Sequence, residues 1–166
     1  MKSLTDQIQS VTERATRRGA LISIPTRTTI IEESRIPFII HVTTLQERKK
    51  QAGSQVAEDG FNPFLPPDPE LVVGDVSPGH LSVLNKFNVL DHHLLIVTRR
   101  YEAQEALLTR EDFEALTECM HEVDGLGFYN GGRVAGASQD HKHLQLCLLY
   151  TSDAADESSR GGVAGG

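Results

Sequence analysis

The sequence predicts one compact domain that combines helices with strands. Its 166 residues suffice for a single hydrophobic core. Two segments show the apolar spacing of amphipathic helices, and several short apolar runs bounded by turn residues are typical of strands. The hydrophobic and charged fractions, 39% and 23%, are ordinary for a globular protein.

Charge and hydropathy argue against several classes of partner. The formal net charge of −7 disfavours non-specific binding to nucleic acid or to an anionic membrane, although a local phosphate pocket stays possible. No stretch approaches about 20 apolar residues, and the N-terminal segment is polar, unlike a signal peptide. Cys119 and Cys147 lack metal-ligand spacing and are interpreted as ordinary thiols. We expect a cytoplasmic location.

Two helices are expected, each with a capping signal. Ser3 with Asp6 and Thr109 with Asp112 have the spacing of capping boxes, and Gly19 and Gly125 are expected to follow the helix ends. The apolar face of the first helix consists of Leu4, Ile8 and Val11. The expected core stripe of the second consists of Phe113, Leu116, Met120 and Val123.

Strands and irregular segments fill the rest of the chain. The strand candidates are Thr28 to Glu32, Pro37 to Thr43, Leu81 to Phe87, His93 to Val97 and a short one around Phe128 and Tyr129. The second candidate is nearly all apolar and is expected to be buried, and the third and fourth are expected to form a hairpin. The connector 62–69 contains four prolines and is expected to be rigid, with Phe64 and Leu65 packed inward.

A basic cluster at Arg48, Lys49 and Lys50 precedes this connector. It is either a solvated turn or a basic loop that closes over phosphates.

The run His141-Lys142-His143-Leu144-Gln145 carries the chemistry. In a strand, side chains alternate between faces, so His141, His143 and Gln145 would share one face. Such a row has three interpretations: a metal site, which would need further ligands such as His92, His93 or Asp140; a structural role; or nucleophilic catalysis on a phosphate ester. A neutral imidazole attacks phosphorus when its far nitrogen is held as N–H, for example by a backbone oxygen at or near His141.

The segment before this run supplies candidate phosphate ligands. Three glycines within residues 130–139 let the backbone approach a phosphate closely. Ser138 and Gln139 add side-chain donors, and Gln145 adds an amide. Lys86, beside Asn85 at a predicted strand end, either meets a phosphate or forms an exposed salt bridge.

Four motifs together resemble the histidine-triad superfamily, in its branch with Gln at the third position, and within it the diadenosine tetraphosphate phosphorylases, also called ATP adenylyltransferases. The motifs lie at Asn62–Pro67, Leu84–Phe87, Phe128–Gly132 and Gly136–Gln145, and the resemblance covers residues 1–146. It implies a histidine-triad-like α+β fold with a mainly antiparallel sheet and flanking helices.

The resemblance also implies the reaction: reversible phosphorolysis of diadenosine tetraphosphate to ATP and ADP through adenylylated His143. His141 and Gln145 would orient His143 and bind the α-phosphate. The substrate site would be lined by Asn85, Lys86, Asn130, Gly136, Ser138, Gln139 and Lys50. No cofactor is expected to be tightly bound, and no metal on the histidines. Mg²⁺ would accompany the polyphosphate.

The chain departs from this family after its catalytic motif. Family members continue with a second half, whereas residues 147–166 resemble a translated sequencing adapter or a disordered tail. We therefore expect an incomplete fold and a fragment with weak or no activity. The alternatives are a nucleotide-sugar uridylyltransferase, a histidine-triad hydrolase and a non-catalytic nucleotide-binding module.

Overall fold

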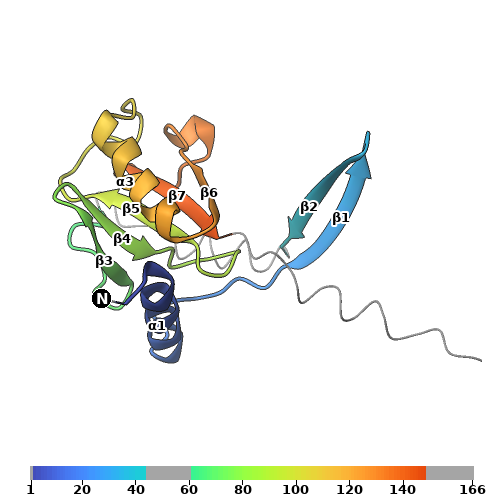
Figure 1. The fold of residues 1–166 in the computed structure, drawn as a ribbon, viewed down its shortest axis with the longest axis horizontal. Coiled ribbons are helices and arrows are strands. Elements are labelled where there is room, and N and C mark those ends of the chain that lie inside the picture. Colours follow the sequence, from blue (N-terminus) through green and yellow to red (C-terminus); the bar gives the residue numbers. More distant parts are fainter. Residues whose placement is uncertain (1, 44–60, 149–166) are drawn as a thin grey trace, which may run out of the picture.

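The computed structural model describes residues 2–43 and 61–148, and every structural statement below refers to these residues. The main body is a five-stranded antiparallel sheet in the order β3-β4-β5-β7-β6 (Figure 1). Its strands are β3 (Val72–Ser77), β4 (His80–Leu84), β5 (Leu94–Thr98), β6 (Gly125–Phe128) and β7 (His143–Leu148). The expected α+β fold with a mainly antiparallel sheet is confirmed, as is the β4–β5 hairpin.

Helix α1 (Leu4–Arg17) forms as predicted. The Ser3 hydroxyl accepts a hydrogen bond from the Asp6 backbone N–H at 3.2 Å, which caps the first turn. The predicted apolar face is buried and extends by one turn to Ala15. Gly19 follows the helix with φ of +71°, a conformation that favours glycine over residues with a Cβ.

Helix α3 (Arg110–Glu122) has the predicted Thr109–Asp112 capping box, but only half of its predicted core stripe is confirmed: Val123 is buried and Leu116 packs against the core, whereas the other two positions do not. Asp112, Ala115 and Cys119 are buried, whereas Phe113 and Met120 are exposed, Met120 to 42%. The physical reason is an ion pair, because the Asp112 carboxylate lies 3.0 Å from the buried ammonium of Lys142. That contact turns a polar side chain of α3 toward the sheet, which the apolar pattern could not reveal.

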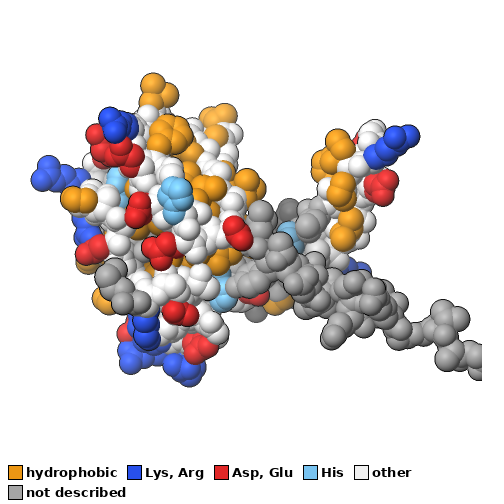
Figure 2. Space-filling model, in the orientation of Figure 1, with side chains coloured by type: hydrophobic (Ala, Val, Ile, Leu, Met, Phe, Trp, Pro, Cys, Tyr) orange, Lys and Arg blue, Asp and Glu red, His pale blue; other side chains and the backbone are white. Residues whose placement is uncertain are grey.

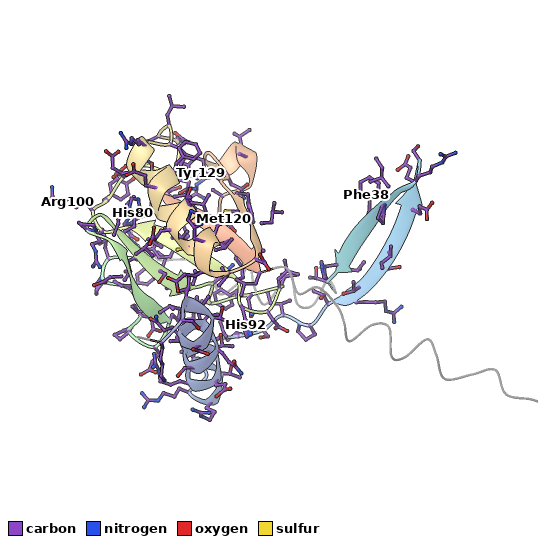
Figure 3. The ribbon with its side chains drawn as sticks, in the orientation of Figure 1. Phe38, His80, His92, Arg100, Met120 and Tyr129 are labelled. Carbon is purple, nitrogen blue, oxygen red and sulfur yellow. The ribbon has the colours of Figure 1, made fainter. Side chains whose placement is uncertain are left out.

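Strands β1 (Arg27–Glu33) and β2 (Ile36–Val42) form a separate two-stranded antiparallel hairpin. It projects from the main body in Figure 1, and in Figure 3 Phe38 extends from β2 on the side of the hairpin that is toward the main body in this view. The expected burial of the second strand is wrong, since Phe38 is 47% exposed and Ile36, Ile40 and Val42 are exposed as well. Apolar side chains accordingly cover the surface of the hairpin in Figure 2. An apolar run indicates that a strand can be buried, but does not say what covers it.

Strand β3, at the edge of the main sheet, was not expected from the sequence. Its register against β4 shifts between Val72 and Gly74 and again between Asp75 and Ser77. Such bulges break the alternation by which a half-buried strand is recognised.

At the other end of the chain, β7 continues two residues past the expected boundary at 146. Cys147 is buried and pairs with Leu126. The rest of the expected tail, 149–166, lies outside the described residues. None of the described helices has the length and apolar character needed to cross a membrane.

Candidate active site

The two faces of the main sheet have different roles. Leu146 pairs with Gly127, where an added Cβ would lie 2.9 Å from Leu116 of α3, so this face of the sheet is covered by the helix. Side chains alternate along β7, and His143 and Gln145 therefore point to the opposite face. A pocket of about 390 Å³ opens there.

The pocket collects most of the residues that the sequence singled out for the site. Those lining it are Asn85, Lys86, Asn130, Gly136, Ser138, Gln139, His143 and Gln145. His141 does not line it, and Lys50 lies outside the described residues. The end of β4 thus meets the glycine-rich loop and the start of β7, both far from it in sequence, around one cavity.

His143 is the buried first residue of β7, and its ring is held in one tautomer. Its Nδ1 lies 2.8 Å from the backbone carbonyl oxygen of His141. A carbonyl only accepts, so Nδ1 carries the proton and the neutral ring keeps its lone pair on Nε2. Burial lowers the pKa of His143 below 6.5, with the hydrogen bond to the His141 carbonyl opposing that shift. The expected carbonyl partner at His141 is therefore present.

The side chain of His141 lies behind the pocket rather than in it. Its Nε2 donates to the Thr98 carbonyl at 2.8 Å, and its Nδ1 lies 2.9 Å from the Asn62 amide nitrogen, which donates to it. Both ring nitrogens are thus occupied by the protein. His141 precedes β7 and forms an isolated bridge with Ala103. The Phe64 ring contacts both histidine rings, at 5.6 and 5.4 Å between centroids, so the two rings lie on one side although only His143 lines the pocket.

His93 lies beside Asn85 and Gln145, and its side chain was expected only as a possible metal ligand. The Asn85 backbone N–H donates to the His93 carbonyl at 2.9 Å, and the Asn85 amide nitrogen lies 3.3 Å from His93 Nδ1. Burial lowers the pKa of His93, and the neighbouring Gln145 side chain opposes this shift. His93 therefore supports the pocket-lining Asn85 and lies beside Gln145. Within the described part of the chain, no three His, Cys, Asp or Glu side chains gather into a group that could hold a metal ion.

The glycine-rich loop is shaped by two positive φ angles and one ion pair. Gly132 and Gly136 have φ of +89° and +97° and flank the short 3-10 helix η1 (Arg133–Ala135). The Arg133 guanidinium donates two hydrogen bonds, of 3.0 and 2.9 Å, to the Asp140 carboxylate. This contact lowers the pKa of Asp140 and closes the loop just before the histidines. The loop thereby presents Gly136, Ser138 and Gln139 to the pocket.

One wall of the pocket is apolar, and sequence reasoning did not assign it to the site. Its residues are Phe61, Pro63, Phe64, Pro66, Leu71, Val83, Phe87 and Leu95. The proline-rich connector supplies several of them, with Phe64 buried as expected, whereas Leu65 is exposed and its expected inward packing is wrong. The prolines that flank Phe64 in the sequence were the available signal for this apolar wall. Such a wall suits a flat, apolar ligand group next to the polar groups of the loop.

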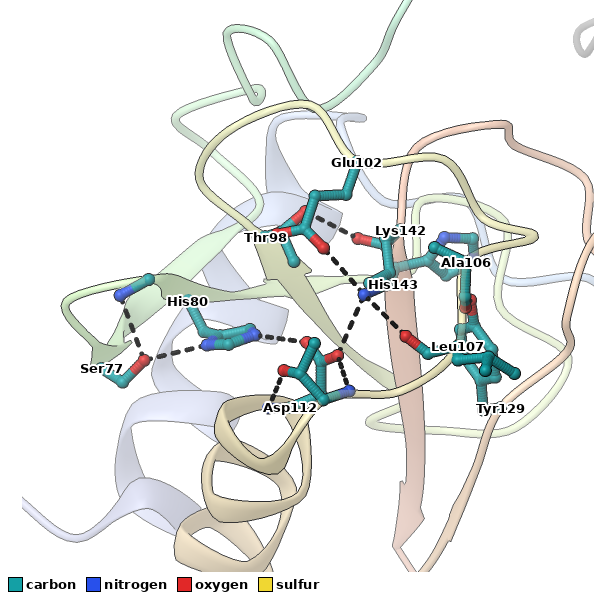
Figure 4. A network of polar contacts seen from close by, with 12 residues as sticks. Ser77, His80, Thr98, Glu102, Ala106, Leu107, Asp112, Tyr129, Lys142 and His143 are labelled. Atoms are coloured by element: carbon teal, nitrogen blue, oxygen red, sulfur yellow. Dashed lines mark hydrogen bonds and ion pairs between the residues drawn. The ribbon is translucent and has the colours of Figure 1, made fainter.

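A buried polar network lies beneath the site, on the helix-covered face (Figure 4). Lys142 is only 1% exposed, and its ammonium lies 2.7 Å from the Glu102 carboxylate and 3.0 Å from that of Asp112. The other Asp112 oxygen lies 2.9 Å from His80 Nε2, and Ser77 contacts the same ring at Nδ1. No role for Lys142 was expected, although its place between two histidines, on the face that strand alternation shares with Leu144 and Leu146, was the available signal.

Comparison with known proteins agrees with this geometry. The family model of the Ap4A phosphorylase N-terminal domain matches residues 1–158. Protein APA1 of Saccharomyces cerevisiae is 32% identical over 146 residues, which cover 79% of this chain and 44% of that protein. Diadenosine 5',5'''-P1,P4-tetraphosphate phosphorylase 2 of the same yeast is 38% identical over 115 residues, covering 61% of this chain and 35% of that protein.

Solved structures give the same result. Yeast Ap4A phosphorylase Apa2 in complex with AMP superposes with a TM-score of 0.73 at 25% identity, over 97% of this chain and 56% of that chain. The same enzyme in complex with Ap4A gives a TM-score of 0.76 at 23% identity, which supports the fold. The chain spans less than half the length of the curated relatives it matches. By its sequence match and its fold, the chain belongs to the Ap4A phosphorylase N-terminal domain family.

Proposed function

We propose that this chain carries the nucleotide-binding and adenylyl-accepting site of a diadenosine tetraphosphate phosphorylase, with His143 as the nucleophile. The observation that carries the proposal is the 2.8 Å contact between His143 Nδ1 and the His141 carbonyl. It leaves the Nε2 lone pair on a ring that lines a pocket with one polar and one apolar side. His143 could therefore act as a nucleophile without first losing a proton.

The proposed reaction has two displacements. In the first, His143 Nε2 attacks the α-phosphorus of diadenosine tetraphosphate and a P–N bond forms. The bond from this phosphorus to the oxygen that bridges to the second phosphate breaks, and ATP leaves with that oxygen. In the second, an oxygen of inorganic phosphate attacks the same phosphorus, the P–N bond breaks, and ADP leaves with His143 neutral again. The His141 carbonyl would stabilise the positive charge of the substituted imidazole between the two steps.

Other residues around the pocket would divide the substrate between them. The apolar wall would hold an adenine, and the loop residues Gly136, Ser138 and Gln139 would meet phosphate oxygens together with Gln145. Asn85, Lys86 and Asn130 stand where they could reach the rest of the nucleotide. His141 would position His143 through its carbonyl, and Lys50 stays a proposed phosphate ligand. A magnesium ion would arrive with the polyphosphate.

The length of the chain bears on turnover. The matched region covers 44% of APA1, so more than half of that relative lies outside the match. We propose that the chain binds nucleotide and accepts an adenylyl group slowly, with weak or no phosphorolytic turnover. Rapid repeated turnover by the 166-residue chain would contradict this. A cytoplasmic location, and the lack of nucleic-acid or membrane partners, stay predictions.

The test is to trap the intermediate. The chain is incubated with diadenosine tetraphosphate labelled in its α-phosphates, and an acid-labile adduct is located by mass spectrometry, with His143→Ala as the control. We expect an adduct in the natural chain that is absent from the variant and that inorganic phosphate converts to ADP. AMP released by water alone would indicate a hydrolase. An adduct only from a uridine nucleotide sugar would indicate a uridylyltransferase, and nucleotide binding with no adduct would indicate a binding module.

A further inference from the structure

Gln104 occupies an unusual place between two segments of the pocket. It lies in the connection between β5 and α3, is 2% exposed, and does not line the pocket itself. Its Oε1 accepts the backbone N–H of His143 at 2.8 Å. Its Nε2 donates to the backbone carbonyls of Asn130, at 2.8 Å, and of His143, at 3.1 Å. One side-chain amide therefore binds the main chain of both the nucleophile and the glycine-rich loop.

The register of the sheet explains why an amide is needed there. Strands β6 and β7 pair from Gly125 with Leu148 to Phe128 with Gln145. Continued in the same antiparallel register, Tyr129 would lie opposite Leu144 and Asn130 opposite His143. Instead β6 ends at Phe128, and the Gln104 side-chain amide bridges the backbones of Asn130 and His143. The pocket also opens at this bridge, because both residues line it.

The backbone of Gln104 is itself fixed from two sides. Its N–H donates to the Asp140 carbonyl at 2.9 Å, and the Tyr129 hydroxyl donates to its carbonyl. Asp140 and Tyr129 stand at the two ends of the glycine-rich loop. The amide is thus held against the same segments that it connects, and its position is not free to drift relative to them.

We infer that Gln104 is a positioning residue that sets the spacing between His143 and the glycine-rich loop. The inference rests on the proposed function, because the spacing matters for reaction only if His143 attacks a phosphate that the loop holds. A reacting pair gains much of its rate from such placement, and a small misplacement lowers the rate more than the affinity. A purely structural amide would instead change only the stability.

The test compares Gln104→Met, which keeps the shape and removes both hydrogen-bonding groups, with Gln104→Glu, which keeps an acceptor for the His143 N–H and loses the donor to Asn130. Ser82→Ala is the matched control. It removes one buried hydrogen bond, to the Gly74 carbonyl at 2.8 Å, on the helix-covered face. For each protein we measure the affinity for AMP, the single-turnover rate of adduct formation and the denaturant midpoint.

For both Gln104 variants we expect adduct formation to slow by roughly 10- to 100-fold while AMP affinity changes by less than about threefold. Ser82→Ala is expected to lower the midpoint and leave the rate unchanged. The inference is overturned if the Gln104 variants react at the natural rate, or if rate and affinity fall in equal proportion.

A second readout separates this inference from the proposed function. If the natural chain forms no adduct, the proposed function fails, and the Gln104 contacts are judged by amide hydrogen exchange. We expect the His143 amide to exchange about tenfold faster in Gln104→Met and to stay protected in Gln104→Glu. We also expect the NMR signals of Gly131 and Gly132 to move in both variants. Unchanged exchange and unchanged loop signals in Gln104→Met would refute the positioning role.

Discussion

The Nδ1 of His143 lies 2.8 Å from the carbonyl oxygen of His141, two residues earlier in the chain. This contact gives the His-x-His spacing a physical meaning. The first histidine contributes its backbone oxygen to the second, and its own ring is used to keep that backbone in place through Thr98 and Asn62. Two identical side chains therefore have different roles, and the difference leads to separable predictions.

Adduct formation should persist into mildly acidic solution. Burial lowers the pKa of His143 from 6.5, so the neutral, nucleophilic ring remains populated at pH values where an exposed histidine is already protonated. The rate should be level above about pH 6.5 and should fall only at lower pH. A pH profile of single-turnover adduct formation, with an NMR titration of the His143 ring, measures this. A midpoint at or above about pH 6.5 would contradict it.

Substitution of the two histidines should separate reaction from stability. His143→Ala should abolish the adduct, because the proposed nucleophile is gone. His141→Ala keeps the carbonyl but leaves the Thr98 carbonyl and the Asn62 amide without their partner, so it should lower the free energy of unfolding by about 2–3 kcal/mol. Its adduct rate, measured at a temperature where the variant is folded, should fall less than tenfold or so. Urea unfolding and adduct trapping on both variants check the contrast, and complete loss of the adduct in folded His141→Ala would refute it.

Helix α3 was predictable at its start and less so on its buried face. Its start is marked by the Thr109–Asp112 capping box, which is local in sequence. The burial of Asp112 depends on Lys142, 30 positions away, and the apolar pattern of the helix carries no sign of that contact. Strand β3 was missed for a related reason, since its bulges are defined by the partner strand.

The site shows the same division. His143, Gln145 and the loop were recognisable because their residue types and spacing are local, and these residues do line the pocket. His141 was expected beside His143, and both rings do contact Phe64. Its engagement by Thr98 and Asn62 could not be predicted, because these partners are 43 and 79 positions away. Gln104 was missed because its partners are backbone atoms 26 and 39 positions away, which leave no mark on the sequence.

The exposed hairpin should bind apolar dyes and promote association. In the register of β1 and β2, Ile31 pairs with Phe38 and Thr29 with Ile40, which places Phe38 and Ile40 on one exposed face with Ile36. A two-stranded sheet is marginal in water by itself, and a continuous apolar face favours aggregation. Replacing Ile36, Phe38 and Ile40 together by threonine keeps strand propensity and should lower both ANS fluorescence and light scattering. Thr28→Ser on the other face is the control, and an unchanged ANS signal would contradict this prediction.

The buried ammonium of Lys142, which pairs with Asp112 of α3, should stabilise the fold more than the exposed Arg110–Glu114 ion pair on that helix. Lys142→Met would leave the Asp112 carboxylate buried with only His80 and the Thr109 N–H as partners, and should lower the free energy of unfolding by about 3–5 kcal/mol. The double variant Lys142→Met with Asp112→Asn removes both charges of this pair and should recover part of that loss. Arg110→Met breaks the exposed Arg110–Glu114 pair and should change stability negligibly. Urea unfolding in low and high salt measures all three, and equal effects of Lys142→Met and Arg110→Met would show that the network does not stabilise the fold.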